Sequence, residues 1–264
     1  MKNYDIIVIG FGKAGKTLAV KAANLGKKVA VIEKSAQMYG GTCINIGCIP
    51  TKKLVNLSKE AQYVNNNVAG EYFTLSIEKK DALVSALRAK NFAMLDGNAN
   101  IDVINGTAKF IDKNSIEVTA TDGSKSTLTA PTIVINTGSV NEKPSFEVSS
   151  NLAFDSTGIL NLKTLPKHLV VVGGGYIGLE FASMFAEFGS KVTVIARSGV
   201  LKNEDEDVKQ SVKALLQTQG VEILEGCEVK NLKDCALNFI QNGETKCLEA
   251  DAFLLATGRV AATA

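Results

Sequence analysis

The stretch IIVIGFGKAG, residues 6–15, decides the fold. Its first four residues, Ile6–Ile9, form a short continuous apolar run, which is typical of a parallel strand buried on both faces. A Gly-x-Gly-x-x-Gly turn, residues 10–15, follows at once. Apolar residues then recur at spacings of three or four up to Leu25, and Gly26 closes the pattern. We therefore predict a strand, a tight turn and a helix, in this order.

The residues of this turn suit a phosphate group. Gly10 permits the tight turn, Gly12 lets a pyrophosphate approach the backbone, and Gly15 allows the helix to pack closely on the strand. The N-terminus of the helix supplies free N–H groups and a positive potential. A second buried run, Val29–Ile32, ends in Glu33, whose carboxylate is well placed for ribose hydroxyls. The pattern predicts a dinucleotide site; the alternative is a tight turn that binds nothing.

The same order of features returns later in the chain. Leu169–Val172 predicts a buried strand, GGGYIG at residues 173–178 repeats the glycine pattern, and Tyr176–Phe188 predicts a helix that ends at Gly189. Val192–Ile195 supplies the second strand. Two such units in one chain are far more specific than one, and they predict two dinucleotide sites.

The second unit differs from the first at one informative position. Ala196 takes the place of Glu33, and Arg197 follows it. Loss of the acid removes repulsion of a 2′-phosphate, and an arginine can pair with that phosphate, with Lys202 as a second cation. We therefore expect the second site to prefer NADPH over NADH. The alternative is an arginine that is simply solvated on a loop.

Between the two units lies GGTCINIGCIPTK, residues 40–52, with two cysteines five positions apart. Pro50 predicts the first turn of a helix over Thr51–Val64. Cys48 then lies near a helix N-terminus, where the dipole favours a thiolate, and Cys43 is near enough in sequence to be its disulfide partner. Two unrelated buried cysteines are the alternative. A zinc site would need two more Cys or His ligands nearby, and the sequence has none there.

The rest of the chain indicates two α/β domains. Leu75–Leu95 predicts a second long helix. Short β-like runs separated by turn residues follow between Ile101 and Thr129, and we predict that they form a small antiparallel meander inserted into an α/β domain. The segment after this domain is loop-rich, so we place the boundary there, between residues 1–145 and 146–264.

Composition limits the partners. With 264 residues and 45% hydrophobic content, the chain can form two domains with substantial cores. A net charge of +2 gives no reason to expect a nucleic acid or an anionic membrane as partner. No stretch reaches the ~18 consecutive apolar residues of a membrane span. We expect a soluble, cytoplasmic protein.

Several further residues are weaker candidates for a functional role. Cys227, Cys235 and Cys247 lack the mutual spacing of a metal or redox site, so we expect them to be inert. His168 precedes a predicted strand, and we expect it to be solvated there. Glu204–Asp207 predicts a solvated acidic face at a helix start, where carboxylates suit the dipole.

Taken together, these motifs resemble those of the class I flavoprotein disulfide reductases, which include dihydrolipoamide dehydrogenase, glutathione reductase and mercuric reductase. The resemblance covers essentially the whole chain. GFGKAGKT at residues 10–17 and CINIGCIPTK at residues 43–52 look closest to a bacterial branch associated with reactive-chlorine resistance. Some members of that branch reduce hypothiocyanous acid, and a copper(II) reductase activity is also attributed to it. The residues that carry the resemblance are Gly10–Gly15, Glu33, Gly41–Cys43, Cys48–Pro50, Thr137-Gly138, Gly173–Gly178 and Thr257–Arg259.

The resemblance implies an α/β fold with two Rossmann-like (GR2-type) dinucleotide-binding domains, each a parallel sheet with helices plus a small antiparallel β-meander. Residues 1–145 would bind FAD and carry the redox disulfide, and residues 146–264 would bind NAD(P)H. NADPH would pass hydride to FAD, which would reduce a Cys43–Cys48 disulfide. Cys43 would then attack a small thiol-reactive oxidant, such as hypothiocyanous acid or a disulfide, while Cys48 contacts the flavin.

The resemblance and the motifs together give the candidate site. FAD and NADPH are the expected cofactors, NADH is less expected, and no metal is expected. The candidate catalytic residues are Cys43, Cys48, Lys52 and Glu180, of which the last two match family positions that pair near the flavin N5. The candidate cofactor-binding residues are Gly10, Gly12, Lys13, Ala14, Gly15, Glu33, Lys34, Gly41, Thr42, Lys52, Thr137, Gly138, Gly173, Gly175, Tyr176, Ile177, Gly178, Arg197, Lys202, Thr257, Gly258 and Arg259.

The chain also departs from the pattern of this family. Members continue with a second FAD-contacting strand and a dimerisation domain, which in many of them carries a catalytic His-Glu pair, and neither appears before Ala264. We therefore expect a C-terminally truncated chain whose parent is a homodimer. A nucleotide-binding fragment without turnover is one alternative function, and a copper or mercuric reductase is another. Arg197 disfavours a dihydrolipoamide dehydrogenase, because that enzyme type prefers NADH.

Overall fold

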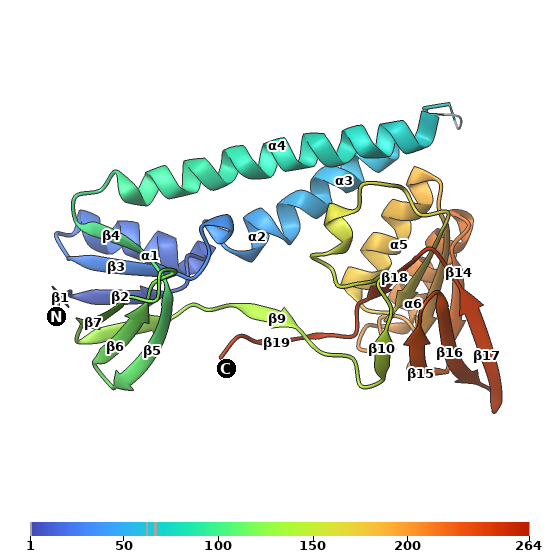
Figure 1. Ribbon diagram of the computed structural model, residues 1–264. Coiled ribbons are helices and arrows are strands. Elements are labelled where there is room, and N and C mark those ends of the chain that lie inside the picture. Colours follow the sequence, from blue (N-terminus) through green and yellow to red (C-terminus); the bar gives the residue numbers. More distant parts are fainter. Residues whose placement is uncertain (1, 62, 66–67, 264) are drawn as a thin grey trace. The chain divides into compact units, whose positions relative to one another are not determined.

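The computed structural model describes residues 2–61, 63–65 and 68–263. The chain divides into two compact α/β units (Figure 1). The first unit comprises Met1–Pro50, Asp81–Ser139 and Ala261–Ala264, and the second comprises Thr51–Lys80 and Val140–Val260. The unit borders fall inside helices α3 (Cys48–Ala61) and α4 (Ala69–Asp96), so each of these helices contributes residues to both units.

The first unit is built on a parallel sheet with the strand order β4-β3-β2-β8. Helix α1 (Lys13–Asn24) connects β2 to β3, and its small residues Ala19 and Ala22 pack with Val8 in one apolar core. The strands are β2 (Ile6–Ile9), β3 (Val29–Glu33), β4 (Ile101–Asn105) and β8 (Thr132–Ile135).

A second sheet, ordered β1-β7-β6-β5, covers the other face of this unit. Ile7 and Ile9 of β2 pack there against Ile116 and Leu128 of the second sheet. Strands β5, β6 and β7 form an antiparallel meander, whereas β1 pairs with β7 in parallel. The strands are β1 (Lys2–Asn3), β5 (Thr107–Asp112), β6 (Ser115–Thr119) and β7 (Lys125–Thr129).

The structure corrects the predicted meander in one respect. Ile101–Ile104 was expected to belong to it. Instead, β4 pairs in parallel with β3 and forms the edge of the parallel sheet. The run is too short for its periodicity to distinguish an edge strand of a parallel sheet from a meander strand.

The second unit repeats this architecture. A parallel sheet has the order β11-β18-β12-β13-β14, and a second sheet has the order β10-β15-β16-β17, in which β15, β16 and β17 are antiparallel. The parallel strands are β11 (Ala153–Phe154), β12 (His168–Val172), β13 (Lys191–Ala196), β14 (Glu222–Glu225) and β18 (Ala252–Leu255). The strands of the second sheet are β10 (Glu147–Ser149), β15 (Cys227–Lys233), β16 (Ala236–Gln241) and β17 (Glu244–Glu249).

The remaining elements are short or connect these sheets. Helix α5 (Tyr176–Phe188) joins β12 to β13, as predicted, and ends at Gly189, whose φ is +105°. The other elements are α2 (Thr42–Asn45), α6 (Glu206–Thr218), the 3₁₀ turns η1 (Ala36–Met38) and η3 (Ile159–Asn161), and the paired strands β9 (Ser139–Asn141) and β19 (Arg259–Ala261).

Two predicted helices begin earlier than expected. α3 begins at Cys48 rather than Thr51, so Pro50 is its third residue, where a missing N–H still costs no helical hydrogen bond. α4 begins at Ala69 rather than Leu75. Gln62, inside the helix predicted over Thr51–Val64, lies outside the described residues.

His168 is not a solvated residue, contrary to expectation. Its ring is half-buried at the start of β12, with Nδ1 3.0 Å from the carbonyl oxygen of Glu249 and Nε2 3.0 Å from Oγ1 of Thr193. Burial, followed by the nearby charge of Lys191, lowers the pKa of His168. Its ring therefore links three strands of the second unit.

The core of the second unit contains a cluster of phenylalanine rings. The Phe73 side chain is fully buried, and its ring centroid lies 5.8 Å from that of Phe185 and 5.2 Å from that of Phe188, the latter in edge-to-face geometry. Such pairs add to the stabilisation that comes from apolar burial. Phe73 on α4 thus anchors this part of the helix to α5.

Replacing Phe73 should therefore destabilise the second unit. We expect Phe73→Ala to lower the free energy of unfolding by about 3–5 kcal/mol, because it removes a fully buried ring and leaves a cavity. Urea denaturation followed by circular dichroism measures this. Leu75→Ala, on the same helix but 44% exposed, is the control and should cost less than about 1 kcal/mol. Equal losses for the two variants would contradict the packing described.

Candidate functional site

The first glycine turn has no space for side chains. Gly10 has a φ of +105°, and a Cβ atom there would lie 2.3 Å from the carbonyl oxygen of Asn136, the residue after β8. A Cβ on Gly15 would lie 2.7 Å from Val8 Cγ1. Asn136 also donates from Nδ2 to the Gly10 carbonyl oxygen at 3.0 Å. The sequence did not indicate this role of Asn136, although its place directly after the apolar run of residues 133–135 was a usable signal.

A second close approach between two backbone segments lies at the start of α1. Gly41 has a φ of +77°, and a Cβ there would lie 2.6 Å from the Cα of Gly12. Gly12 caps α1 without a side-chain hydrogen bond, so the first-turn N–H groups of Lys13 and Ala14 face no capping group. These residues fit the pyrophosphate of a dinucleotide, which needs a close backbone approach and free N–H donors.

Glu33 is the last residue of β3 and is buried. Its Oε2 accepts a hydrogen bond from the backbone N–H of Phe11 at 3.0 Å, and its Oε1 accepts one from the N–H of Ser35 at 3.2 Å. An ionised carboxylate has about four acceptor positions, so two remain for ribose hydroxyls. Lys34 is exposed beside it, and the structure gives it no contact with this carboxylate.

The two cysteines of the candidate redox pair meet in the first unit. Cys43 is the second residue of α2 and is half-buried, and Cys48 is the exposed first residue of α3. Their side chains lie next to each other, and neither cysteine is in a disulfide. The hydrogen bond with Cys48, burial and the charge of Cys48 raise the pKa of Cys43, whereas the cation of Lys13 acts in the opposite direction.

Two lysines on α1 supply positive charge to this thiol pair. Lys13 is exposed in the first turn of α1, and Lys16 is half-buried one turn later. The Lys16 ammonium donates to the Asn91 side chain. Burial and the charge of Lys13 lower the pKa of Lys16, and the charge of Cys43 opposes them. The sequence reasoning missed Lys16, although its spacing of three from Lys13 on a helix next to the glycine turn could have indicated it.

Lys52 and Glu180 form an ion pair within the second unit. Lys52 comes from α3 and Glu180 from α5. The Lys52 side chain is 69% exposed, so the pair itself contributes little to stability. The pairing that the sequence suggested is present, and the role of the pair beside a flavin stays a prediction.

The second glycine turn lines a cavity of about 700 Å³. A Cβ on Gly173, whose φ is +125°, would lie 2.3 Å from the carbonyl oxygen of Ala256, and one on Gly178 would lie 2.3 Å from the Gly173 oxygen. Gly175 caps α5 without a side-chain hydrogen bond. The turn therefore offers the same fit to a pyrophosphate as the first one.

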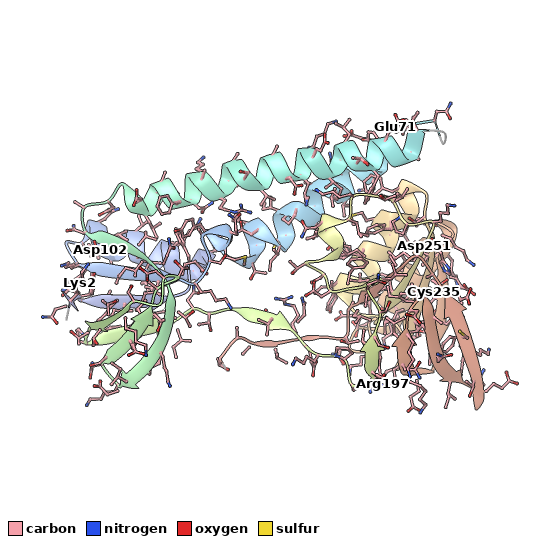
Figure 2. All side chains as sticks on the ribbon, viewed as in Figure 1. Lys2, Glu71, Asp102, Arg197, Cys235 and Asp251 are labelled. Carbon is pink, nitrogen blue, oxygen red and sulfur yellow. The ribbon has the colours of Figure 1, made fainter. Side chains whose placement is uncertain are left out.

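Two of the cationic residues that line this cavity are on the loop after β13. Arg197 and Lys202 both line the cavity and are exposed, and Figure 2 labels Arg197 on this unit. Tyr176, in the first turn of α5, donates from its hydroxyl to Glu204 on the same wall. Glu204 is therefore hydrogen-bonded, not merely solvated as predicted. Ile177 is partly exposed next to Tyr176.

The two Thr-Gly motifs lie after corresponding strands of the two units. Gly138 has a φ of +73°, and its carbonyl oxygen accepts from the N–H of Ala262 at 3.0 Å. Gly258 has a φ of +141°, its carbonyl oxygen accepts from the N–H of Glu142 at 3.0 Å, and Thr257 beside it lines the cavity. Arg259 donates to Asn141 Oδ1 at 2.5 Å. Thr137 precedes Gly138, and the structure shows no ligand contact that tests its role.

The profile of the pyridine nucleotide-disulphide oxidoreductase family matches residues 4–264. The chain belongs to this family. Membership in this flavoprotein disulfide reductase family implies FAD and a pyridine nucleotide as cofactors. Both glycine turns fit such ligands, because glycines leave the backbone of each turn free of side chains.

Individual members of the family are similar over the whole chain. The chain is 46% identical to the probable pyridine nucleotide-disulfide oxidoreductase RclA of Escherichia coli K12, over 100% of this chain and 58% of that protein. It is 36% identical to a mercuric reductase of Lysinibacillus sphaericus, over 97% of this chain and 48% of that protein. A solved Cu(II) complex of the HOCl-induced flavoprotein disulfide reductase RclA from E. coli superposes with a TM-score of 0.90 at 44% identity, covering 100% of this chain and 58% of that one. The chain thus spans about half the length of the curated relatives it matches.

Among the described residues, no group of three or more His, Cys, Asp or Glu side chains is arranged to hold a metal ion. None of the helices in the described part of the chain has the length and apolar content needed to cross a bilayer.

The influence of Cys48 on Cys43 can be tested through the acidity of Cys43. Cys48→Ala removes the group whose hydrogen bond and charge raise the pKa of Cys43, so this pKa should fall. Alkylation of Cys43 by iodoacetamide, followed by peptide mass spectrometry as a function of pH, should then reach its maximal rate at lower pH. Cys235→Ala changes an exposed thiol in the turn between β15 and β16 and serves as the control. An unchanged profile in Cys48→Ala would contradict the coupling.

Proposed function

We propose that this protein is an NADPH-dependent FAD flavoenzyme that passes electrons to the Cys43–Cys48 pair and reduces a small thiol-reactive oxidant, such as hypothiocyanous acid or a disulfide. One observation carries the proposal. The two thiols lie next to each other, and they are in the same compact unit as the turn of residues 10–15, whose Gly12 backbone touches Gly41 two residues before Cys43.

In this proposal, residues 1–145 bind FAD and residues 146–264 bind the nicotinamide coenzyme. When bound, FAD supplies a carrier that takes two electrons from the nicotinamide and delivers them to a disulfide. The chain itself binds the pyrophosphates at its two glycine turns and keeps side chains away from them. On the resemblance alone, we also propose a cytoplasmic homodimer for the whole protein.

The two cysteines would carry out the reduction in two exchanges. The Cys43 thiolate attacks the electrophilic sulfur of the oxidant and forms a bond to it, while the bond to the leaving group breaks. The Cys48 thiolate then attacks Cys43 sulfur, closes the Cys43–Cys48 disulfide and releases the reduced substrate. Two electrons and two thiol protons leave the pair in total. Lys13 supports the first attack, because its cation opposes the rise in the pKa of Cys43.

Copper(II) reduction is a second candidate, favoured by one finding. The superposable E. coli RclA was solved as a Cu(II) complex. This chain offers two neighbouring thiols, Cys43 and Cys48, as a source of electrons. Copper would then be the substrate, and the same cysteine pair would deliver the electrons.

The flavin spectrum and substrate turnover test the proposal directly. The purified protein should be yellow, with a flavin absorbance that bleaches when NADPH is added under argon. NADPH oxidation should follow addition of hypothiocyanous acid or a disulfide, with Cu(II) and Hg(II) as parallel assays. Cys43→Ser should keep the NADPH-dependent bleaching and lose turnover by several orders of magnitude. Retained turnover in Cys43→Ser would contradict the thiol mechanism. NADPH binding without flavin would favour a nucleotide-binding fragment.

Arg197 provides the test of coenzyme choice. Its guanidinium can make charge-assisted hydrogen bonds to the 2′-phosphate of NADPH, so Arg197→Ala should weaken NADPH binding roughly 10- to 100-fold. NADH lacks this phosphate and should bind about as before. Fluorescence titration with each coenzyme measures the two dissociation constants. Lys191→Ala, at the other end of β13, is the matched control and should change neither. Equal weakening of both coenzymes by Arg197→Ala would argue against a 2′-phosphate contact.

A further inference from the structure

The loop that carries Arg197 and Lys202 has an unusual backbone. It connects β13 to α6 and lines the cavity of the second glycine turn. Gly199 has a φ of +81°, and Leu201, a non-glycine residue, has a φ of +46°. A branched side chain in this left-handed region is disfavoured and persists only where the surroundings hold it. The loop is therefore held by contacts outside itself.

One of these contacts joins the loop to the glycine turn. The Leu201 N–H donates to the carbonyl oxygen of Gly174 at 2.8 Å. A Cβ on Gly174 would lie 2.9 Å from the carbonyl oxygen of Gly199 and 3.0 Å from the Cα of Val200. The loop thus lies directly on the bare backbone of the turn, and a small shift of either would move the other.

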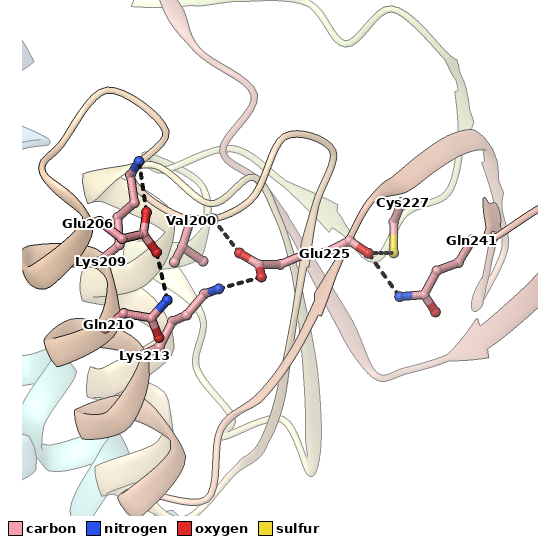
Figure 3. Close-up of polar contacts among 8 residues, drawn as sticks. All are labelled: Val200, Glu206, Lys209, Gln210, Lys213, Glu225, Cys227 and Gln241. Atoms are coloured by element: carbon pink, nitrogen blue, oxygen red, sulfur yellow. Dashed lines mark hydrogen bonds and ion pairs between the residues drawn. The ribbon is translucent and has the colours of Figure 1, made fainter.

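The second contact comes from Glu225, the last residue of β14 (Figure 3). Its Oε1 accepts a hydrogen bond from the Val200 N–H at 2.9 Å. A Cβ on Gly199 would lie 2.9 Å from this same oxygen, so the carboxylate also presses against the loop where only glycine fits. Glu225 therefore holds the two residues that precede the strained Leu201.

Glu225 is itself fixed by a cation on α6. Its Oε2 pairs with Lys213 Nζ at 2.5 Å, with both side chains partly buried (Figure 3). Burial alone would raise the pKa of Glu225, but the hydrogen bonds from Lys213 and the Val200 N–H outweigh it and lower the pKa. The carboxylate is thus ionised at neutral pH, and Lys213 offsets its charge next to a site that we propose for an anionic phosphate.

We propose that Glu225 is a positioning residue for coenzyme selection: by holding the Val200 N–H, it sets the loop conformation that presents Arg197 and Lys202 to the 2′-phosphate. This inference rests on the proposed binding of NADPH in this cavity. Glu225 does not touch the coenzyme in this scheme. Its effect passes through the backbone of the loop, so it selects between coenzymes and does not act in hydride transfer.

The test compares dissociation constants for NADPH and NADH, measured by fluorescence titration of the whole protein. Glu225→Ala removes the acceptor for the Val200 N–H, so we expect NADPH binding to weaken about fivefold or more and NADH binding to change less than about twofold. Glu225→Gln keeps an acceptor oxygen and should restore most of the NADPH preference. Glu244→Ala, which removes an exposed carboxylate at the start of β17, is the control and should change neither constant.

The outcomes separate this inference from the proposed function. A wild-type protein that does not prefer NADPH overturns both. A wild type that prefers NADPH, with the same NADPH-to-NADH ratio in Glu225→Ala, overturns the role of Glu225 alone, as does an equal loss of both coenzymes. If Glu225→Ala does not fold, Lys213→Met decides. It frees Glu225 from its anchor without replacing any residue of the loop, and it should lower the NADPH preference in the same direction; an unchanged preference would refute the proposal.

Discussion

Both units depend on a close backbone contact that only glycine permits. The first glycine of each turn lies against the carbonyl oxygen of the residue that follows a neighbouring parallel strand: Gly10 against Asn136 and Gly173 against Ala256, with 2.3 Å left for a Cβ in each case. The contact arises because β8 and β18 are parallel neighbours of β2 and β12 and end at the same edge of their sheets. It brings a helix N-terminus to that edge, where an open α/β sheet binds its ligands.

Much of this arrangement could be predicted from the sequence, because glycine spacing and apolar runs reflect the conformation of the local backbone. The ranges of β2 and α5 agree with prediction to the residue. What could not be predicted depends on contacts between distant segments. The edge position of Ile101–Ile104 is set by pairing with β3, and the half-buried ring of His168 is set by Glu249 and Thr193. Neither partner can be read from the local pattern of a short run.

In the candidate site too, local features could be predicted from the sequence, whereas features that depend on distant contacts could not. The cysteine spacing and the helix after it were sufficient to predict that Cys43 and Cys48 belong together, and the thiols are in contact. The charges around them were not predictable in the same way. Lys16 and Asn91 meet from two helices, and the influence of Lys13 on Cys43 follows from the contact of Gly12 with Gly41. The glycine contact that admits a pyrophosphate therefore also brings cationic charge to the thiols.

The two units differ in which carboxylate holds the backbone beside the glycine turn. In the first, Glu33 at the end of β3 binds the backbone N–H groups of Phe11 and Ser35, so one carboxylate both holds the turn and remains available to ribose. In the second, Ala196 occupies that position and can do neither. A carboxylate from the next strand, Glu225, holds the loop from behind, and Lys213 offsets its charge. Moving the acid away from the glycine turn leaves Lys143, Arg197 and Lys202 as the cations that line the cavity, which suits the additional phosphate that we propose there.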